Sequence, residues 1–294
     1  MKRIVLTVLI LVLLLNLCSC AIAELEPPVP SSSVAEHMTE PIEILHIITE
    51  PIESLVPTEP PEPTIPSLGE SAGPRYECYY SDDLDDYLNY YVHIPENAVE
   101  NMPLLVYLHG NGEVNKPHSL LEYGISSFAK EHYGEDFPFI ILEPNTRVKS
   151  WTLNNIPELL IGVIDRVTKR YSTNPDKTIL TGFSQGAIGV WGVVSIYGDY
   201  FSAAVPVSSP HSGDINYINL AKVPFWTFAG DVGDTERWYH KYLAQNVDQI
   251  TVLGGFGKFT VLEGSDHNHA PQKAYTREVF DWMLAQERGV IPEE

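Results

Sequence analysis

The chain has 294 residues, 44% of them hydrophobic, which is enough to bury a full core in one domain with appended segments. Its formal net charge of -21 argues against nucleic acid or another polyanion as a partner. Two of the three cysteines, Cys18 and Cys20, lie near the N-terminus. Cys78 therefore has no internal disulfide partner, and we expect it to be a small buried residue.

Residues 1–20 have the pattern of an export signal. A positively charged start precedes an apolar run, 4–15, which is shorter than a typical membrane span. Leu-Cys-Ser-Cys at 17–20 resembles the lipobox of bacterial lipoproteins, and this resemblance implies cleavage before Cys20 and acylation of its thiol. The alternative is an ordinary signal peptide cut shortly after that cysteine. Both interpretations predict export, and a lipidated Cys20 would hold the protein on the outer face of a bacterial membrane.

The next segment, 21–74, is rich in Pro, Glu, Ser and Thr and contains a loose Thr-Glu-Pro repeat. Regular prolines remove amide donors and the acidic side chains repel one another, so we expect an extended tether without packed structure. A partner-binding proline motif is the alternative for this segment. The folded domain is expected over 75–294.

Within 75–294, strand patterns alternate with helical patterns. The predicted strands are 76–80, 87–94, 104–109, 139–142, 177–180, 203–207, 223–229 and 256–262, and the predicted helices are 120–132, 157–171, 187–196, 236–247 and 271–287. The first two strands are joined by an acidic turn, which predicts a hairpin at the sheet's edge. The alternation predicts an α/β fold with a mostly parallel central sheet of about eight strands, flanked by helices on both faces.

The sequence Gly182-Phe183-Ser184-Gln185-Gly186 lies between a predicted strand and a predicted helix. G-x-S-x-G in this context is a nucleophile elbow. The turn is so tight that the serine adopts a strained conformation and larger side chains two residues away would collide. The turn also aims the first amides of the new helix at the serine. We therefore predict that Ser184 is a catalytic nucleophile.

A serine hydroxyl needs a base, since unassisted it is a poor nucleophile at neutral pH. In folds with this elbow the base follows the last strand, and the loop after 256–262 contains His267 and His269. We predict His267 as the base, because it comes three residues after the glycine that ends the strand, and His269 as a solvated loop residue. Asp266 and the two histidines lack helical H-x-x-x-H spacing, so no metal site is predicted.

The acid that orients the histidine is expected after the strand 223–229. Three carboxylates compete in this loop. Asp234 is the first choice because it is nearest to the usual spacing of three beyond the glycine, Glu236 is the second and Asp231 the third. The two that are not the acid are expected to be helix caps or solvated charges.

An oxyanion site needs amides from the residue after the serine and from the loop after an early strand. The first is Gln185. For the second, Leu-His-Gly-Asn-Gly-Glu at 108–113 follows the strand 104–109, and its glycines allow close approach of a substrate. Asn111 is the main candidate and Gly112 the alternative. His109 is expected to support the loop rather than act as a base.

Several segments together resemble α/β-hydrolases: 91–95, 103–113, Trp151, 182–186, 201–207 and the loop with Gly264 and His267. More narrowly, the chain is similar to the branch of polyhydroxybutyrate-depolymerase-like, feruloyl and acetyl-xylan esterases, over roughly residues 76–290. The acid loop departs from this family's common H-G-x-x-D pattern.

This resemblance implies hydrolysis of carboxylic esters through an acyl-enzyme, without a cofactor. For an exported enzyme, acetyl or feruloyl esters of polysaccharides are the expected substrates. Trp151, in the loop after 139–142, is predicted either to stack on a sugar or aromatic acyl group or to pack in the site wall. A peptidase or acyltransferase on the same fold, and a non-catalytic glycan-binding surface lipoprotein, are the alternative functions.

Overall fold

The structure, a computed structural model, describes residues 72–211 and 213–293. The predicted signal peptide, the predicted acylation of Cys20 and the predicted tether as far as residue 71 lie outside these residues. Across the described ranges, no helix combines the length and the apolar character needed to cross a membrane.

The described strands form one sheet of eight in the order β1-β2-β4-β3-β5-β6-β7-β8. The strands are β1 (Gly73–Ser81), β2 (Asp86–Ile94), β3 (Leu104–Leu108), β4 (Ile140–Asn145), β5 (Thr178–Phe183), β6 (Ala203–Val207), β7 (Phe225–Gly230) and β8 (Gly257–Leu262). β1 and β2 form an antiparallel hairpin at one edge, β2 pairs antiparallel with β4, and every later pairing is parallel. The predicted mostly parallel sheet is confirmed.

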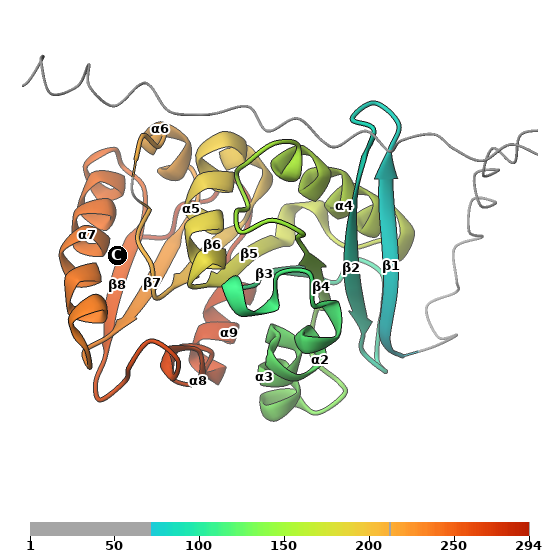
Figure 1. Cartoon of the computed structure of the whole chain (residues 1–294), viewed down its shortest axis with the longest axis horizontal. Helices are drawn as coiled ribbons and strands as arrows, with labels where there is room; N and C mark the ends of the chain where they lie inside the picture. The colour runs from blue at the N-terminus through green and yellow to red at the C-terminus, as the bar shows by residue number, and fades with distance from the viewer. Residues whose placement is uncertain (1–71, 212, 294) are drawn as a thin grey trace, which may run out of the picture. The chain divides into compact units, whose positions relative to one another are not determined.

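Helices cover both faces of this sheet (Figure 1). α4 (Ile156–Tyr171), α5 (Gln185–Tyr197) and α7 (Asp234–Val252) contribute to the apolar core on one face. α3 (Ile125–Tyr133), α8 (Ala270–Ala274) and α9 (Arg277–Ala285) contribute to the core on the other face. Two of the described helices have only four residues each, α2 (Leu120–Tyr123) and α6 (Tyr217–Leu220), and α6 was not predicted.

Two predicted helices are interrupted. The helix predicted at 120–132 breaks at Gly124, whose backbone is extended and whose added Cβ would lie 2.3 Å from Oε1 of Glu143. The same carboxylate accepts a hydrogen bond from the Ser126 amide, which starts the new helix α3. The helix predicted at 271–287 ends at Ala274 and begins again after Thr276, whose side chain accepts from the amide of Val279.

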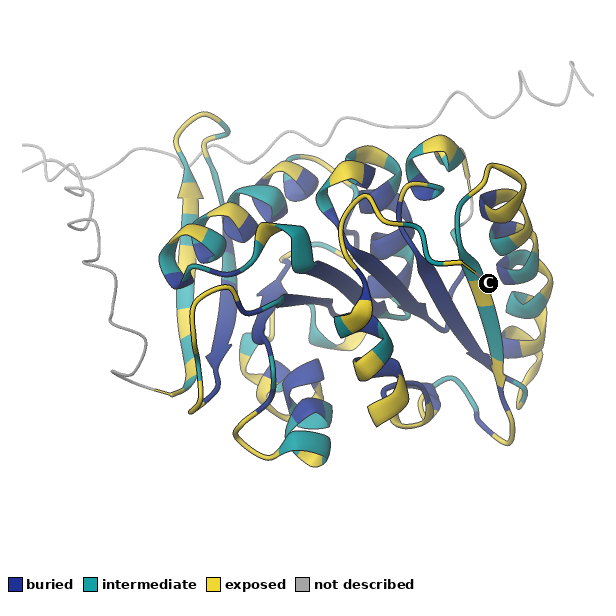
Figure 2. Cartoon of the chain, turned by 180° about the vertical axis from the view of Figure 1, so that it is seen from behind, coloured by how far each residue is buried: buried dark blue, intermediate teal, exposed yellow. Residues whose placement is uncertain are grey.

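The central strands are buried and the hairpin edge is half-exposed (Figure 2). All residues of β3, β4, β6 and β7 are buried, as continuous apolar strands between two helical layers must be. β1 instead alternates between exposed and intermediate residues. Cys78 is on its exposed side, so the expectation that it is buried is wrong.

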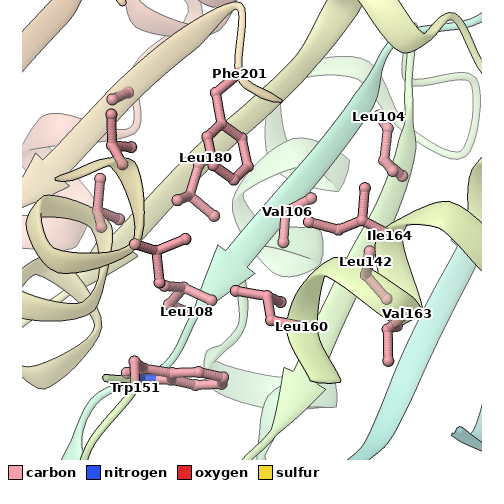
Figure 3. Close-up of a cluster of buried hydrophobic side chains, with 14 of the residues drawn as sticks. Leu104, Val106, Leu108, Leu142, Trp151, Leu160, Val163, Ile164, Leu180 and Phe201 are labelled. Carbon is pink, nitrogen blue, oxygen red and sulfur yellow. The ribbon is translucent and has the colours of Figure 1, made fainter. Parts of the chain in front are cut away.

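The core beneath the carboxyl ends of β3 and β5 is built from side chains of the sheet and α4. Leu108 and Leu180 from the strands and Leu160 from α4 are fully buried in it, and Trp151 lies at one end of the cluster (Figure 3). Close packing of this kind holds the two strand ends in a fixed relation. The next residues along the chain, at 109–111 and 184–185, include those predicted to form the site.

Candidate active site

The elbow at Ser184 has the expected strained geometry. Ser184 lies between β5 and α5 with φ 56° and ψ -114°, in the positive-φ region that side chains rarely adopt. A Cβ on Gly186 would lie 1.7 Å from the carbonyl oxygen of Leu108, and a Cβ on Gly182 would lie 2.7 Å from the backbone of Gly186. Only glycine fits at these two positions, which explains the motif's spacing.

The structure brings Ser184 and His267 together, although they are separated by 83 residues. Ser184 Oγ lies 2.9 Å from Nε2 of His267, in the loop between β8 and α8. His269 instead faces away from this pair: it is exposed, and its Nδ1 lies 2.7 Å from Oδ1 of Asp266. The hydrogen bond from His269 lowers the pKa of the Asp266 carboxyl.

The carboxylate on His267 is Glu236, the second choice from the sequence, and the first choice Asp234 is wrong. Oε1 of Glu236 lies 2.7 Å from Nδ1 of His267, and the glutamate is buried. Asp234 is exposed and its Oδ1 pairs with Arg237 at 3.1 Å. The physical reason is that α7 already begins at Asp234, so its first turn directs the residue two positions later toward the sheet.

Glu236 is held by further donors. Its Oε2 accepts from the amide of Gly230 at 2.6 Å and from the Ser208 hydroxyl at 3.1 Å. The N-terminal turn of α7 also favours a negative charge at this position. These donors keep the buried carboxylate satisfied and oriented. Ser208 was not predicted, although its place immediately after the strand at 203–207, next to the elbow strand, is a signal that could have identified it.

Asp231, the third candidate for the acid, joins the two loops that carry the acid and the base. Its Oδ1 accepts from the amide of Gly264 at 2.7 Å, and the next amide, Val232, donates to the carbonyl of Ser265 at 3.0 Å. The loops are in such close contact that a Cβ on Gly230 would lie 2.1 Å from the Ser265 oxygen. Asp231 therefore positions the histidine loop and does not contact the histidine ring through any hydrogen bond.

The loop predicted to supply the second oxyanion amide lies beside the elbow. A Cβ on Gly110 would lie 3.6 Å from Cβ of Ser184, and the 3-10 helix η1 (Asn111–Glu113) begins at the next residue. Asn111 and Gly112 are both exposed, while Gln185 is the first residue of α5. The structure thus places both predicted backbone segments next to Ser184.

His109 supports this loop from below, as expected. It is fully buried, its Nδ1 donates to the carbonyl of Gly110 at 2.6 Å, and its Nε2 accepts from the amide of Thr146 at 3.2 Å. Burial lowers the pKa of His109 to about 4, so the ring is neutral at ordinary pH. A neutral ring with one donor and one acceptor matches both partners.

The prediction that Trp151 contacts substrate is wrong, and its alternative, packing in the wall, describes what is found. Trp151 is 1% exposed, and its indole Nε1 donates to the carbonyl of His109 at 3.0 Å. Its ring meets the His109 ring edge-to-face and packs against Gly189 of α5. The indole therefore supports the backbone of the 109–111 loop, and no face of it is open to a ligand.

Ser184, His267 and Glu236 form a continuous hydrogen-bonded chain from a hydroxyl through an imidazole to a buried carboxylate. The carboxylate fixes the proton on Nδ1, which leaves Nε2 free to accept the serine proton. Such a chain supports acyl transfer by nucleophilic attack of the hydroxyl. Among the described residues, no group of three or more His, Cys, Asp or Glu side chains is arranged to hold a metal ion.

The fold is shared with many solved structures. A thermostable esterase superposes with a TM-score of 0.63 and 20% identity, covering 73% of this chain and 63% of that one. The chain has the α/β-hydrolase fold. Other structures with this fold are an S-formylglutathione hydrolase of Staphylococcus aureus (TM-score 0.55, 18% identity, 72% and 100% coverage) and a serine mutant of the Clostridium thermocellum feruloyl esterase module solved with sinapinate (0.53, 14%, 75% and 90%).

Comparison by sequence alone matches a smaller part of this α/β-hydrolase-fold protein. No protein-family model matches the chain. A bifunctional acetylxylan esterase/xylanase of Neocallimastix patriciarum is 26% identical over 125 residues, which is 41% of this chain. The chain spans only 18% of the length of that relative.

Proposed function

We propose that the protein is a serine hydrolase that cleaves carboxylic esters through an acyl-enzyme. The observation that carries this proposal is the hydrogen-bonded chain of Ser184, His267 and Glu236 on a strained elbow at the carboxyl end of the sheet. Several proteins that share the fold are named esterases, which agrees with the proposal.

In the proposed mechanism, Ser184 Oγ attacks the ester carbonyl carbon while Nε2 of His267 takes the hydroxyl proton. The amides of Gln185 and Asn111 donate to the oxyanion that develops. Removal of one such donor typically costs about 3 to 4 kcal/mol of barrier. The intermediate collapses and His267 returns the proton to the departing alcohol. Water then attacks the acyl group on Ser184 by the same steps, and releases the acid.

We propose acetyl or feruloyl groups on a polysaccharide as the substrate class. The proposal is supported by the names of an acetylxylan esterase relative and of a feruloyl esterase with the same fold. The connection between β6 and β7 also supports it. The described residues of this connection contain one helix of four residues, α6, which is too short to form a large lid over the site. An open site suits an ester on a polymer chain.

The central test compares the full-length protein with Ser184→Ala on p-nitrophenyl acetate. The proposal requires turnover by the wild type and loss of turnover in the variant by orders of magnitude. Equal background rates for the two proteins would refute it. Acetylated xylan, methyl ferulate and a short polyhydroxyalkanoate then distinguish the substrate classes.

We further propose that the protein is exported and held on the outer face of a bacterial membrane by acyl chains on Cys20. The support is the sequence 1–20 with its lipobox-like end. Labelling with a fatty-acid analogue during expression tests this. The wild type should incorporate the label and Cys20→Ala should not. A wild type that is exported without label would favour the ordinary signal peptide.

A further inference from the structure

Aromatic rings extend along α7 from the imidazole of the site. The ring centroid of Tyr239 lies 6.3 Å from that of His267, and Trp238 lies 5.8 Å from Tyr239. Tyr242, one helical turn further on, lies 4.2 Å from Trp238. We call Trp238, Tyr239 and Tyr242 the α7 aromatic rim. It reaches the site through Tyr239, the one of the three rings that lies next to the imidazole.

Trp238 is largely exposed, unlike two tryptophans that pack in the core. Trp238 is 53% exposed, whereas Trp151 and Trp191 are 1% and 0% exposed. Val232, in the loop between β7 and α7, is also exposed, at 47%. The Trp238 side chain therefore does not contribute to the core. Its indole packs against Tyr242 on one side, and about half of its surface is exposed to solvent. An apolar patch shared by several neighbouring exposed or half-exposed rings is typical of a binding surface.

The chemistry of the rim fits a neutral sugar ring better than an acyl group. An acyl group in a binding pocket is enclosed on most of its surface, which a half-exposed indole on a helix cannot do. A pyranose ring needs only a flat apolar support for its C–H face, because its hydroxyl groups remain in water. The net charge of -21 further disfavours an anionic polymer.

We propose that the α7 aromatic rim binds neutral pyranose rings of the polysaccharide that carries the scissile ester. This rests on the proposed esterase function and names the part of the substrate held beside the site. Trp238 supplies the stacking surface, Tyr242 keeps the indole in place, and Tyr239 connects this surface to the histidine. The rim therefore sets preference for an ester on a sugar polymer over a free small ester.

The test measures kcat/KM of the full-length protein on acetylated xylan and on p-nitrophenyl acetate. Trp238→Ala should lower the ratio of the two values about tenfold, the loss expected from one aromatic stacking contact. Trp238→Phe, which keeps a ring, should retain most of the ratio. Tyr80→Ala is the matched control, because Tyr80 is 52% exposed on β1 at the opposite edge of the sheet, and should leave the ratio unchanged.

A binding experiment separates this proposal from the proposed function. Ser184→Ala protein should be retarded in native gels that contain xylan, and adding Trp238→Ala should abolish the retardation. An unchanged ratio in Trp238→Ala, failure of the wild type to act on acetylated xylan, or equal retardation with and without Trp238 would each overturn the role of the rim. A wild type inactive on p-nitrophenyl acetate would instead overturn the esterase proposal, whatever the gels show.

Discussion

The Oε1 atom of Glu236 lies 2.7 Å from Nδ1 of His267, on the side of the imidazole opposite Ser184. The acid thus comes from the first turn of α7 and not from the loop before it. A carboxylate in this place fixes the tautomer of the ring and stabilises the imidazolium that forms when the serine proton is taken.

Glu236→Gln should lower kcat for p-nitrophenyl acetate about a thousandfold to ten-thousandfold, because the amide cannot stabilise the imidazolium and favours the wrong tautomer. Asp234→Asn is the control. Its carboxylate is exposed and pairs with Arg237, so the variant should retain wild-type activity. Loss of activity in Asp234→Asn with an active Glu236→Gln would reverse the assignment.

A site residue could be predicted from the sequence where the contacts that fix its position are local. Ser184 is recognisable because its glycines are required by contacts within the elbow and with the adjacent strand. His267 is recognisable from its place after the last strand. The acid was misassigned because the two main candidates, Asp234 and Glu236, are only two positions apart. The sequence alone does not determine where α7 begins, and hence which of the two faces the histidine.

The remaining errors depend on distant contacts. The break at Gly124 is imposed by Glu143, which comes from β4 and caps α3. The place of Trp151 in the loop after a central strand suggested contact with substrate. Only the fold reveals that its Nε1 donates to the carbonyl of His109, 42 residues away. The place of Ser208 after β6 could have suggested a role, but only the fold reveals that its hydroxyl binds Glu236, 28 positions away.

Ser208 should act on the reaction by positioning Glu236. Replacing it removes a donor to a buried carboxylate, and such a bond is typically worth about 1.5 to 3 kcal/mol, so kcat should fall about tenfold or more. Ser208 has φ 55°, which favours glycine, so Ser208→Gly separates the loss of the hydroxyl from backbone strain. Ser208→Gly and Ser208→Ala should lose similar activity, and a fully active Ser208→Gly would show that the hydroxyl is dispensable.

Gly186→Ala should destabilise the protein by about 3 kcal/mol or more, because its methyl group would overlap a backbone oxygen that no rotamer change can move. The added Cβ would lie 1.7 Å from the Leu108 oxygen. Gly112→Ala is the matched control for stability, since a Cβ there has nothing within 4 Å. Thermal unfolding of the two variants measures the difference. Equal melting temperatures would mean that α5 and β3 are less closely packed than the structure indicates.

His109 should make stability depend on pH. Its pKa is lowered by burial to about 4 in the folded protein, against an ordinary value of 6.5 in the unfolded chain. Between these values the unfolded state binds a proton that the folded state does not, so the free energy of unfolding rises with pH. The contribution of His109 to stability is therefore complete above pH 6.5 and is lost as pH falls from 6.5 toward 4. The difference corresponds to about 3 kcal/mol. Urea unfolding of the wild type and of His109→Gln between pH 4 and 7 measures it: the variant should be less stable at pH 7 but show a smaller decline on acidification. Parallel curves for the two proteins would mean that another group causes the pH dependence.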